Sequence, residues 1–326
     1  AHLPWSVDEN LDTIDSYDFN GKLNGPMTAH PRICPETGEL LFFGYQMMKK
    51  PYLTYHRVSK EGELVQSEEI DIPRPVMMHD WNITRNYVIF MDLPLVVDID
   101  EAVSGSDPFG FKPECGARLG VMPRNGSNSD IKWIEINPCF VFHPMNAYEE
   151  GDNIILHVCR QNKAMVGGMD EIYGGVDTTG KLWKWTINLT SGSCLEEQID
   201  DRPCDFARVD DRLVGLKAKN GYAMALDEKA DTLTFDQYLY KFDLENNKRI
   251  DHDLGENVFG GEPIFVPKNK DLSEDNGWIM AIVYDANIDK SKLIIVDTEN
   301  FDKKPSGEVI LPQRVPFGAH GSWLSN

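Results

Sequence analysis

Residues 35–45 run Pro-Glu-Thr-Gly-Glu-Leu-Leu-Phe-Phe-Gly-Tyr, a turn signal that leads directly into an apolar stretch. Proline and glycine favour the turn, and the aliphatic and aromatic residues that follow favour a β-strand. The same combination of a turn and a strand-length run recurs along the chain, which predicts an all-β fold. The predicted strands are Leu40 to Tyr45, Tyr52 to Val58, Tyr87 to Met91, Asn153 to Val158, Leu182 to Ile187, Tyr238 to Phe242, Trp278 to Tyr284 and Lys292 to Val296.

Helical periodicity is scarce, and we expect only a short helical turn at Asp98 to Val103. Many short antiparallel strands at fairly even spacing indicate a sandwich, a barrel or a propeller. The loosely repeated hairpins favour a β-propeller, in which each blade is a four-stranded meander, although no strict repeat is present. No low-complexity linker divides the chain, so we expect a single domain over residues 1–326.

The composition excludes several classes of protein. The chain has 326 residues with 53 acidic and 32 basic side chains, which gives a formal net charge of -21. This excess of carboxylates argues against nucleic acid as a partner and against electrostatic docking on anionic lipid. A small apolar patch could still make peripheral contact with a membrane. The apolar runs are of strand length, and a transmembrane helix needs about 20 apolar residues.

The six cysteines indicate the cellular compartment. They are scattered along the chain and form no Cys-x-x-Cys pair. In a chain of this length, such cysteines predict reduced thiols and a cytoplasmic location.

Four of the eight histidines share a distinctive context of small, apolar or aromatic neighbours near the edge of a predicted strand. They are His30, His79, His143 and His320. Their separations of 49, 64 and 177 residues exclude a local zinc motif. A propeller could still bring them together, because the inner strands of different blades line one axis. Four neutral imidazoles would suit a divalent iron with open positions for a small ligand. The simpler alternative is that each histidine is a hydrogen-bonded core residue.

At these four segments the sequence resembles the carotenoid cleavage oxygenase family, which includes lignostilbene dioxygenases and the retinoid isomerase. The matching stretches keep the family's order and approximate spacing across essentially the whole chain. They are residues 25–31 with 35–40, 78–84, 142–150, 260–267 and 311–321.

This resemblance implies a seven-bladed β-propeller that holds Fe(II) on its axis through His30, His79, His143 and His320. It also implies carboxylates that hydrogen-bond the far nitrogen of three of these ligands. Glu262 matches the carboxylate expected for His320. Asp205 would support His143, but it is one methylene shorter than the family's glutamate, so a bridging water or a small backbone shift is an open alternative.

The third carboxylate, for His79, should precede the segment Leu3-Pro4-Trp5. We therefore expect this glutamate to lie outside the printed sequence and the N-terminal blades to be missing from it. The family's phenol-anchoring tyrosine and lysine would lie upstream as well, so the sequence leaves the substrate class open.

The resemblance implies O2-dependent cleavage of a conjugated C=C bond in a small apolar substrate, which gives two carbonyl products. No protein nucleophile or general acid is expected beyond the metal centre. The substrate would be a carotenoid or apocarotenoid, and the alternative is a stilbene-type phenolic. Competing hypotheses are a non-catalytic propeller that binds a metal or ligand, and retinoid-type isomerisation without cleavage. The oligomeric state stays open.

Overall fold

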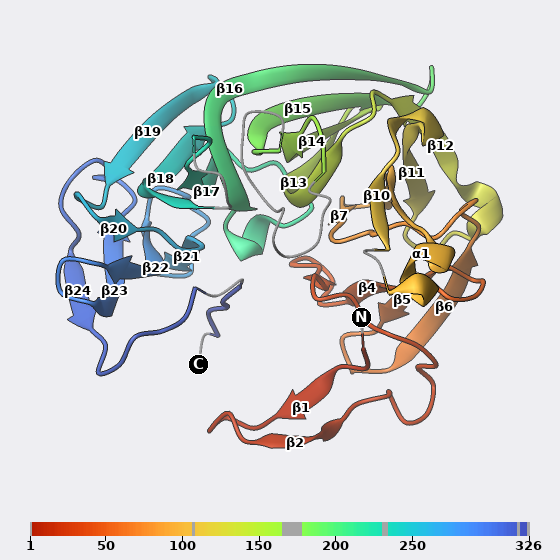
Figure 1. Cartoon of the computed structure of the whole chain (residues 1–326), viewed down its shortest axis with the longest axis horizontal. Helices are drawn as coiled ribbons and strands as arrows, with labels where there is room; N and C mark the ends of the chain where they lie inside the picture. The colour runs from red at the N-terminus through yellow and green to blue at the C-terminus, as the bar shows by residue number, and fades with distance from the viewer. Residues whose placement is uncertain (1, 106–107, 165–177, 230–233, 318–319, 325–326) are drawn as a thin grey trace.

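The structure is a computed structural model that describes residues 2–105, 108–164, 178–229, 234–317 and 320–324. Within these ranges every pairing between strands is antiparallel, and the sheets lie side by side in an arc (Figure 1). The one α-helix in the described part of the chain is α1 (Ile99–Ser104), at the position where a short helical turn was predicted. The all-β prediction is therefore confirmed.

Two four-stranded sheets form the N-terminal part of the arc. Their strand orders are β3-β4-β5-β6 and β12-β11-β8-β7. The strands are β3 (Arg32–Ile33), β4 (Leu40–Tyr45), β5 (Leu53–Val58), β6 (Leu64–Ile70), β7 (Asn82–Ile83), β8 (Tyr87–Asp92), β11 (Ala117–Pro123) and β12 (Lys132–Ile136). Two separate pairs accompany them, β1 (Trp5–Val7) with β2 (Thr13–Ser16) and β9 (Leu95–Val97) with β10 (Phe109–Phe111).

A continuous seven-stranded sheet follows, because one long strand takes part in two blades. The first part of β16 pairs with β15, and its last residues pair with β17. The strands are β13 (Phe140–Glu150), β14 (Asn153–Gln161), β15 (Lys181–Asn188), β16 (Ser193–Arg208), β17 (Asn220–Leu226), β18 (Phe235–Asp243) and β19 (Lys248–Asp253).

The last sheet contains β20 (Val258–Phe259), β21 (Ile264–Pro267), β22 (Gly277–Asp285), β23 (Lys290–Asp297) and β24 (Gly307–Ile310). Short 3₁₀ turns lie at Pro113–Cys115, Asn128–Asp130 and Asp211–Leu213. Each of the eight predicted strands is present. The described strands thus form five blade-like units, which agrees with the expectation that this chain holds an incomplete seven-bladed propeller.

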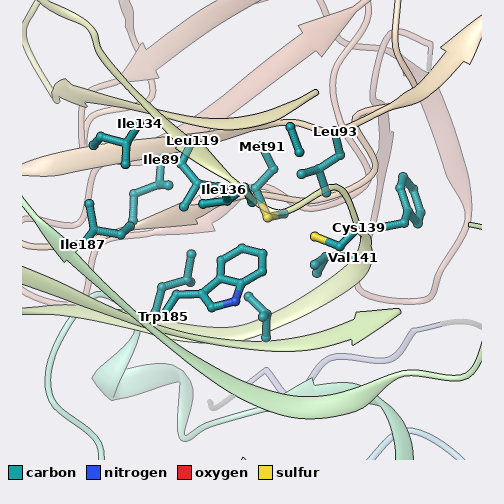
Figure 2. Close-up of a cluster of buried hydrophobic side chains, with 14 of the residues drawn as sticks. Ile89, Met91, Leu93, Leu119, Ile134, Ile136, Cys139, Val141, Trp185 and Ile187 are labelled. Atoms are coloured by element: carbon teal, nitrogen blue, oxygen red, sulfur yellow. The ribbon is translucent and has the colours of Figure 1, made fainter. Parts of the chain in front are cut away.

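Apolar side chains between neighbouring blades hold the arc together (Figure 2). Ile89 and Leu119 come from one blade, whereas Trp185 and Ile187 come from the next, and all four side chains are completely buried. Because a buried aromatic or aliphatic side chain stabilises the fold by roughly 1.5–3 kcal/mol, this contact fixes one blade against the other. The inner edges of the blades are thereby held in place.

Two further features bear on the sequence predictions. All six cysteines are free thiols. Among the described residues, no helix is long and apolar enough to cross a bilayer. The cytoplasmic location, the peripheral membrane contact and the single-domain organisation stay predictions.

Candidate metal centre

The four predicted histidines converge from four separate parts of the chain. His30 lies just before β3, from which Pro31 separates it, and His79 lies shortly before β7. His143 lies within β13, and His320 follows the last strand, β24. One ring nitrogen from each lies within 4.8 Å of the others. Since β3, β7 and β13 are each the edge strand of their sheet, the inner edges of the blades bring these rings together.

The contacts between the rings indicate a cation site. Nε2 of His79 lies 3.1 Å from Nε2 of His30 and 3.2 Å from Nε2 of His143. A neutral imidazole has one N–H and one lone pair. Where the N–H of a ring is at Nδ1, its Nε2 lone pair points toward the other Nε2 atoms. Such lone pairs repel one another unless a cation lies between them, so the arrangement fits a transition-metal ion with imidazole ligands.

Asp205 determines the tautomer of His143. Oδ1 of Asp205 lies 3.0 Å from Nδ1 of His143, and it also accepts a hydrogen bond of 2.8 Å from the backbone N–H of Phe206. An ionised carboxylate only accepts hydrogen bonds, so Nδ1 carries the proton and Nε2 presents its lone pair. The contact is direct, and no bridging water is needed despite the shorter side chain.

Irregular strand geometry accompanies this contact on both sides. The pairing of β13 with β14 shifts register between Val141 and Asn146, around His143. The pairing of β16 with β17 shifts between Asp205 and Arg208, where Phe206 has φ of +55°. A left-handed φ is uncommon for a bulky residue, and bulges of this kind redirect side chains beside functional sites. His143 and Asp205 thus both lie in irregular parts of their strands.

Glu262 supports His320 in the same way. Its Oε1 lies 3.1 Å from Nδ1 of His320, and its Oε2 accepts a 2.8 Å hydrogen bond from the backbone N–H of Gly321. Arg208 donates to Oε1 at 3.1 Å. The side chain of Glu262 is only 6% exposed, whereas that of His320 is 28% exposed. A buried, three-fold hydrogen-bonded carboxylate thus holds the most accessible of the four rings.

A third carboxylate at the centre, that of Asp80, was not expected from the sequence. Oδ2 of Asp80 lies 3.5 Å from Nδ1 of His30, and Arg32 donates from Nη2 to both oxygens of Asp80 at 2.7 and 2.8 Å. A signal was present, because Asp80 directly follows His79 and Arg32 comes two residues after His30. No hydrogen bond to Nδ1 of His79 is found within the described ranges, and the glutamate expected for it stays a prediction.

Burial keeps two of the rings neutral. Desolvation, followed by the neighbouring rings of His143 and His320, lowers the pKa of His79 to about 3. Burial also lowers the pKa of His30, and the neighbouring ring of His79 lowers it further. For His143, burial lowers the pKa, but the Asp205 carboxylate and more distant acidic groups outweigh it, and the net shift is upward. Neutral imidazoles are the form that binds metal.

Aromatic side chains lie against two rings of the centre, and an apolar cavity adjoins it at His320. The ring of Phe142 lies 5.2 Å from His79, and that of Phe206 lies 4.6 Å from His143, measured between centroids. A cavity of about 390 Å³ reaches His320 and Glu262. Most of its wall is apolar, with contributions from Phe235, Ile264, Met280, Ile282, Leu293 and Phe317.

Comparison with known proteins identifies the family. Residues 1–325 match the family described as "Retinal pigment epithelial membrane protein". The chain belongs to this carotenoid oxygenase family. Among its curated relatives is the carotenoid 9,10(9',10')-cleavage dioxygenase 1 of Pisum sativum, which is 35% identical over 335 residues, 98% of this chain. The carotenoid cleavage oxygenase of Mycobacterium tuberculosis is 30% identical over 365 residues and is matched over 72% of its length.

Solved structures of family members show the same architecture. The lignostilbene dioxygenase of Pseudomonas brassicacearum matches all of this chain and 72% of its own, with a TM-score of 0.89 and 26% identity. The cobalt-substituted apocarotenoid oxygenase of Synechocystis matches all of this chain and 71% of its own, with a TM-score of 0.89 and 28% identity. The propeller prediction is therefore confirmed. The chain spans 61% of the length of the Pisum sativum relative.

Proposed function

We propose that this member of the carotenoid oxygenase family is a non-heme Fe(II) dioxygenase that cleaves a conjugated C=C bond of a carotenoid or apocarotenoid. The observation that carries the proposal is the convergence of His30, His79, His143 and His320 within 4.8 Å. These four imidazoles would hold the iron. Bound ferrous iron supplies a site for activating O2 beside the alkene.

The protein's own groups prepare the site in three ways. Asp205 and Glu262 fix the tautomers of His143 and His320, so that both rings present a lone pair to the centre. Burial holds His30 and His79 neutral. Four neutral ligands leave the +2 charge of the metal uncompensated, which distinguishes this set from the two-histidine, one-carboxylate triad of many non-heme oxygenases.

The cavity beside His320 supports an apolar substrate. Its volume of about 390 Å³ falls within the usual range for small-molecule pockets, roughly 300–1,000 Å³. Its apolar walls bind by burial of hydrocarbon surface, and the aromatic rings of Phe235 and Phe317 suit a flat conjugated chain. The overall reaction balances without a reductant, because the two alkene carbons supply the four electrons that reduce O2 to two carbonyl oxygens.

The relatives support the choice of substrate. The curated relatives from Pisum sativum and Mycobacterium tuberculosis carry names that specify carotenoid cleavage. The alternative is stilbenoid cleavage, which is favoured by the structural match to the lignostilbene dioxygenase of Pseudomonas brassicacearum. We rank the carotenoid class first because several of the curated relatives are named for it.

The test uses protein loaded anaerobically with Fe(II), then mixed with O2 and either an apocarotenal or a hydroxystilbene. The proposal predicts two carbonyl products from the apocarotenal, with turnover that requires both iron and O2. Preferential cleavage of the hydroxystilbene would show that the substrate is a stilbenoid, and it would leave the proposed cleavage reaction unchanged. Iron binding without products from either compound would favour the non-catalytic propeller.

A further inference from the structure

The carboxylate beside His30 has a different origin from the other two. Asp205 and Glu262 each lie more than 55 residues from the histidine that they contact. Asp80 instead follows His79 directly in the sequence and contacts His30, the neighbouring ring of the centre. One loop segment therefore provides one candidate ligand and a carboxylate for another.

Asp80 is held firmly in this position. Only 3% of its side chain is exposed. Oδ1 accepts hydrogen bonds from Arg32 Nη2 at 2.7 Å and from the backbone N–H of Trp81 at 2.7 Å, while Oδ2 accepts from the same Arg32 nitrogen at 2.8 Å. A buried carboxylate is costly to desolvate unless it is paired and hydrogen-bonded. These contacts satisfy it and restrict its rotation.

Further hydrogen bonds tie the two loops together. The indole N–H of Trp81 donates to the backbone oxygen of His30 at 2.9 Å. Arg32 Nη2 also donates to the backbone oxygen of Trp81 at 3.1 Å. On the other side, the backbone N–H of His30 donates to Thr28 Oγ1 at 3.1 Å. The backbones that carry His30 and His79 are thus fixed to each other through Trp81 and Arg32.

We propose that Asp80, held by Arg32, is a positioning residue for His30: it attracts the Nδ1 proton and so directs the Nε2 lone pair toward the metal. This inference deepens the proposed function and rests on the metal centre that it assumes. The 3.5 Å separation is longer than a standard hydrogen bond. The effect of Asp80 is therefore smaller than that of Asp205 or Glu262, and we place it at the lower end of the usual 10- to 100-fold loss for such residues.

The test must separate positioning of His30 from simple stabilisation of the fold. The Arg32→Gln/Asp80→Asn double variant removes both charges together and leaves no unpaired buried ion. The matched control is Arg57→Gln/Glu39→Gln, which neutralises an ion pair in the blade that contains Arg32, with N···O of 2.6 Å. For each protein, Co(II) affinity is measured by competition with a chelator, together with the visible Co(II) spectrum and the melting temperature of the metal-free form.

We expect the Asp80 double variant to bind Co(II) about tenfold more weakly, with an altered ligand-field spectrum, while the control pair matches the wild type in both. Arg32→Lys keeps the Asp80 carboxylate and a positive charge beside it. Its Co(II) affinity should therefore fall by less than about threefold, which is below the usual loss for residues of this kind. This single variant, compared with Asp80→Asn, tests the inference even if the double variant does not fold.

Unchanged Co(II) affinity and spectrum in a folded Asp80 variant would overturn the inference and leave the metal centre intact. An equal loss in Arg32→Lys and Asp80→Asn would also overturn it, because the ion pair rather than the carboxylate would then matter. Absence of Co(II) binding by the wild type would overturn the proposed centre, and the inference with it.

Discussion

Replacing Glu262 by glutamine tests the role of a buried carboxylate at the metal centre. Glutamine has nearly the same shape but only one acceptor oxygen. In the structure, Oε1 of Glu262 accepts from His320 and Arg208, while Oε2 accepts from the backbone N–H of Gly321. Whichever way the amide is oriented, its NH2 group meets at least one N–H donor. At least one hydrogen bond that holds His320 or the adjoining backbone is therefore lost.

The expected magnitude follows from that lost contact. Loss of a partner that orients a metal-bound histidine typically weakens metal binding by about 10- to 100-fold, equivalent to ~1.4 to ~2.7 kcal/mol. This range matches the roughly 1.5–3 kcal/mol of a hydrogen bond to a charged group. We expect a loss within this range for Glu262→Gln, with the fold retained.

The assay is a competition titration of the metal-free protein with Fe(II) or Co(II) under anaerobic conditions, combined with thermal unfolding. The control is Glu256→Gln, an exposed glutamate of the same region, which should bind metal as the wild type does. If Glu262→Gln and Glu256→Gln both retained wild-type affinity and turnover, the Glu262 carboxylate would be merely structural and the reasoning would be refuted.

Three other changes probe the core, a buried histidine and a close backbone approach. Trp185→Ala should destabilise the fold by about 3–5 kcal/mol in denaturant titrations, because Trp185 is completely buried between two blades; a loss below 1 kcal/mol would contradict the assigned packing. Burial lowers the pKa of His157 to about 4, and neither ring nitrogen has a hydrogen-bond partner among the residues that the structure describes, so the unfolded state binds its proton first as the pH falls. Stability should therefore drop by up to about 3 kcal/mol between roughly pH 6.5 and 4, and His157→Leu should flatten this slope; an identical slope would contradict it. A Cβ at Gly261 would meet the backbone oxygen of Ile282 at 2.2 Å, so Gly261→Ala should shift Glu262 and weaken metal binding; equal affinity to the wild type would show that the backbone adjusts.

The strands were predictable because their signals are local. The Pro35-to-Gly38 turn and the apolar run after it define β4 by themselves, and every predicted strand has a counterpart in the structure. Convergence of the histidines was also predictable, once a propeller was assumed, because the inner strands of its blades line one axis.

Other parts of the site depend on tertiary contacts and escaped the sequence analysis. The pairing of Asp80 with His30 joins two loops that lie 50 residues apart. The positions of Asp80 and Arg32 close to predicted ligands place both near the centre, but they do not show that Asp80 contacts His30. The left-handed backbone of Phe206 arises at a register shift between two strands. Propensity alone would not predict it, because aromatic residues rarely adopt positive φ.

We expect the four-histidine centre to hold one iron, and we expect this iron to be required for cleavage. The most direct measurement is O2-dependent turnover of an apocarotenal as a function of Fe(II) bound per chain, from metal-free protein to saturation. Turnover should rise in proportion to bound iron and reach a plateau at one iron per chain, with two carbonyl products throughout. Cleavage by metal-free protein, or a full complement of iron without product, would contradict it.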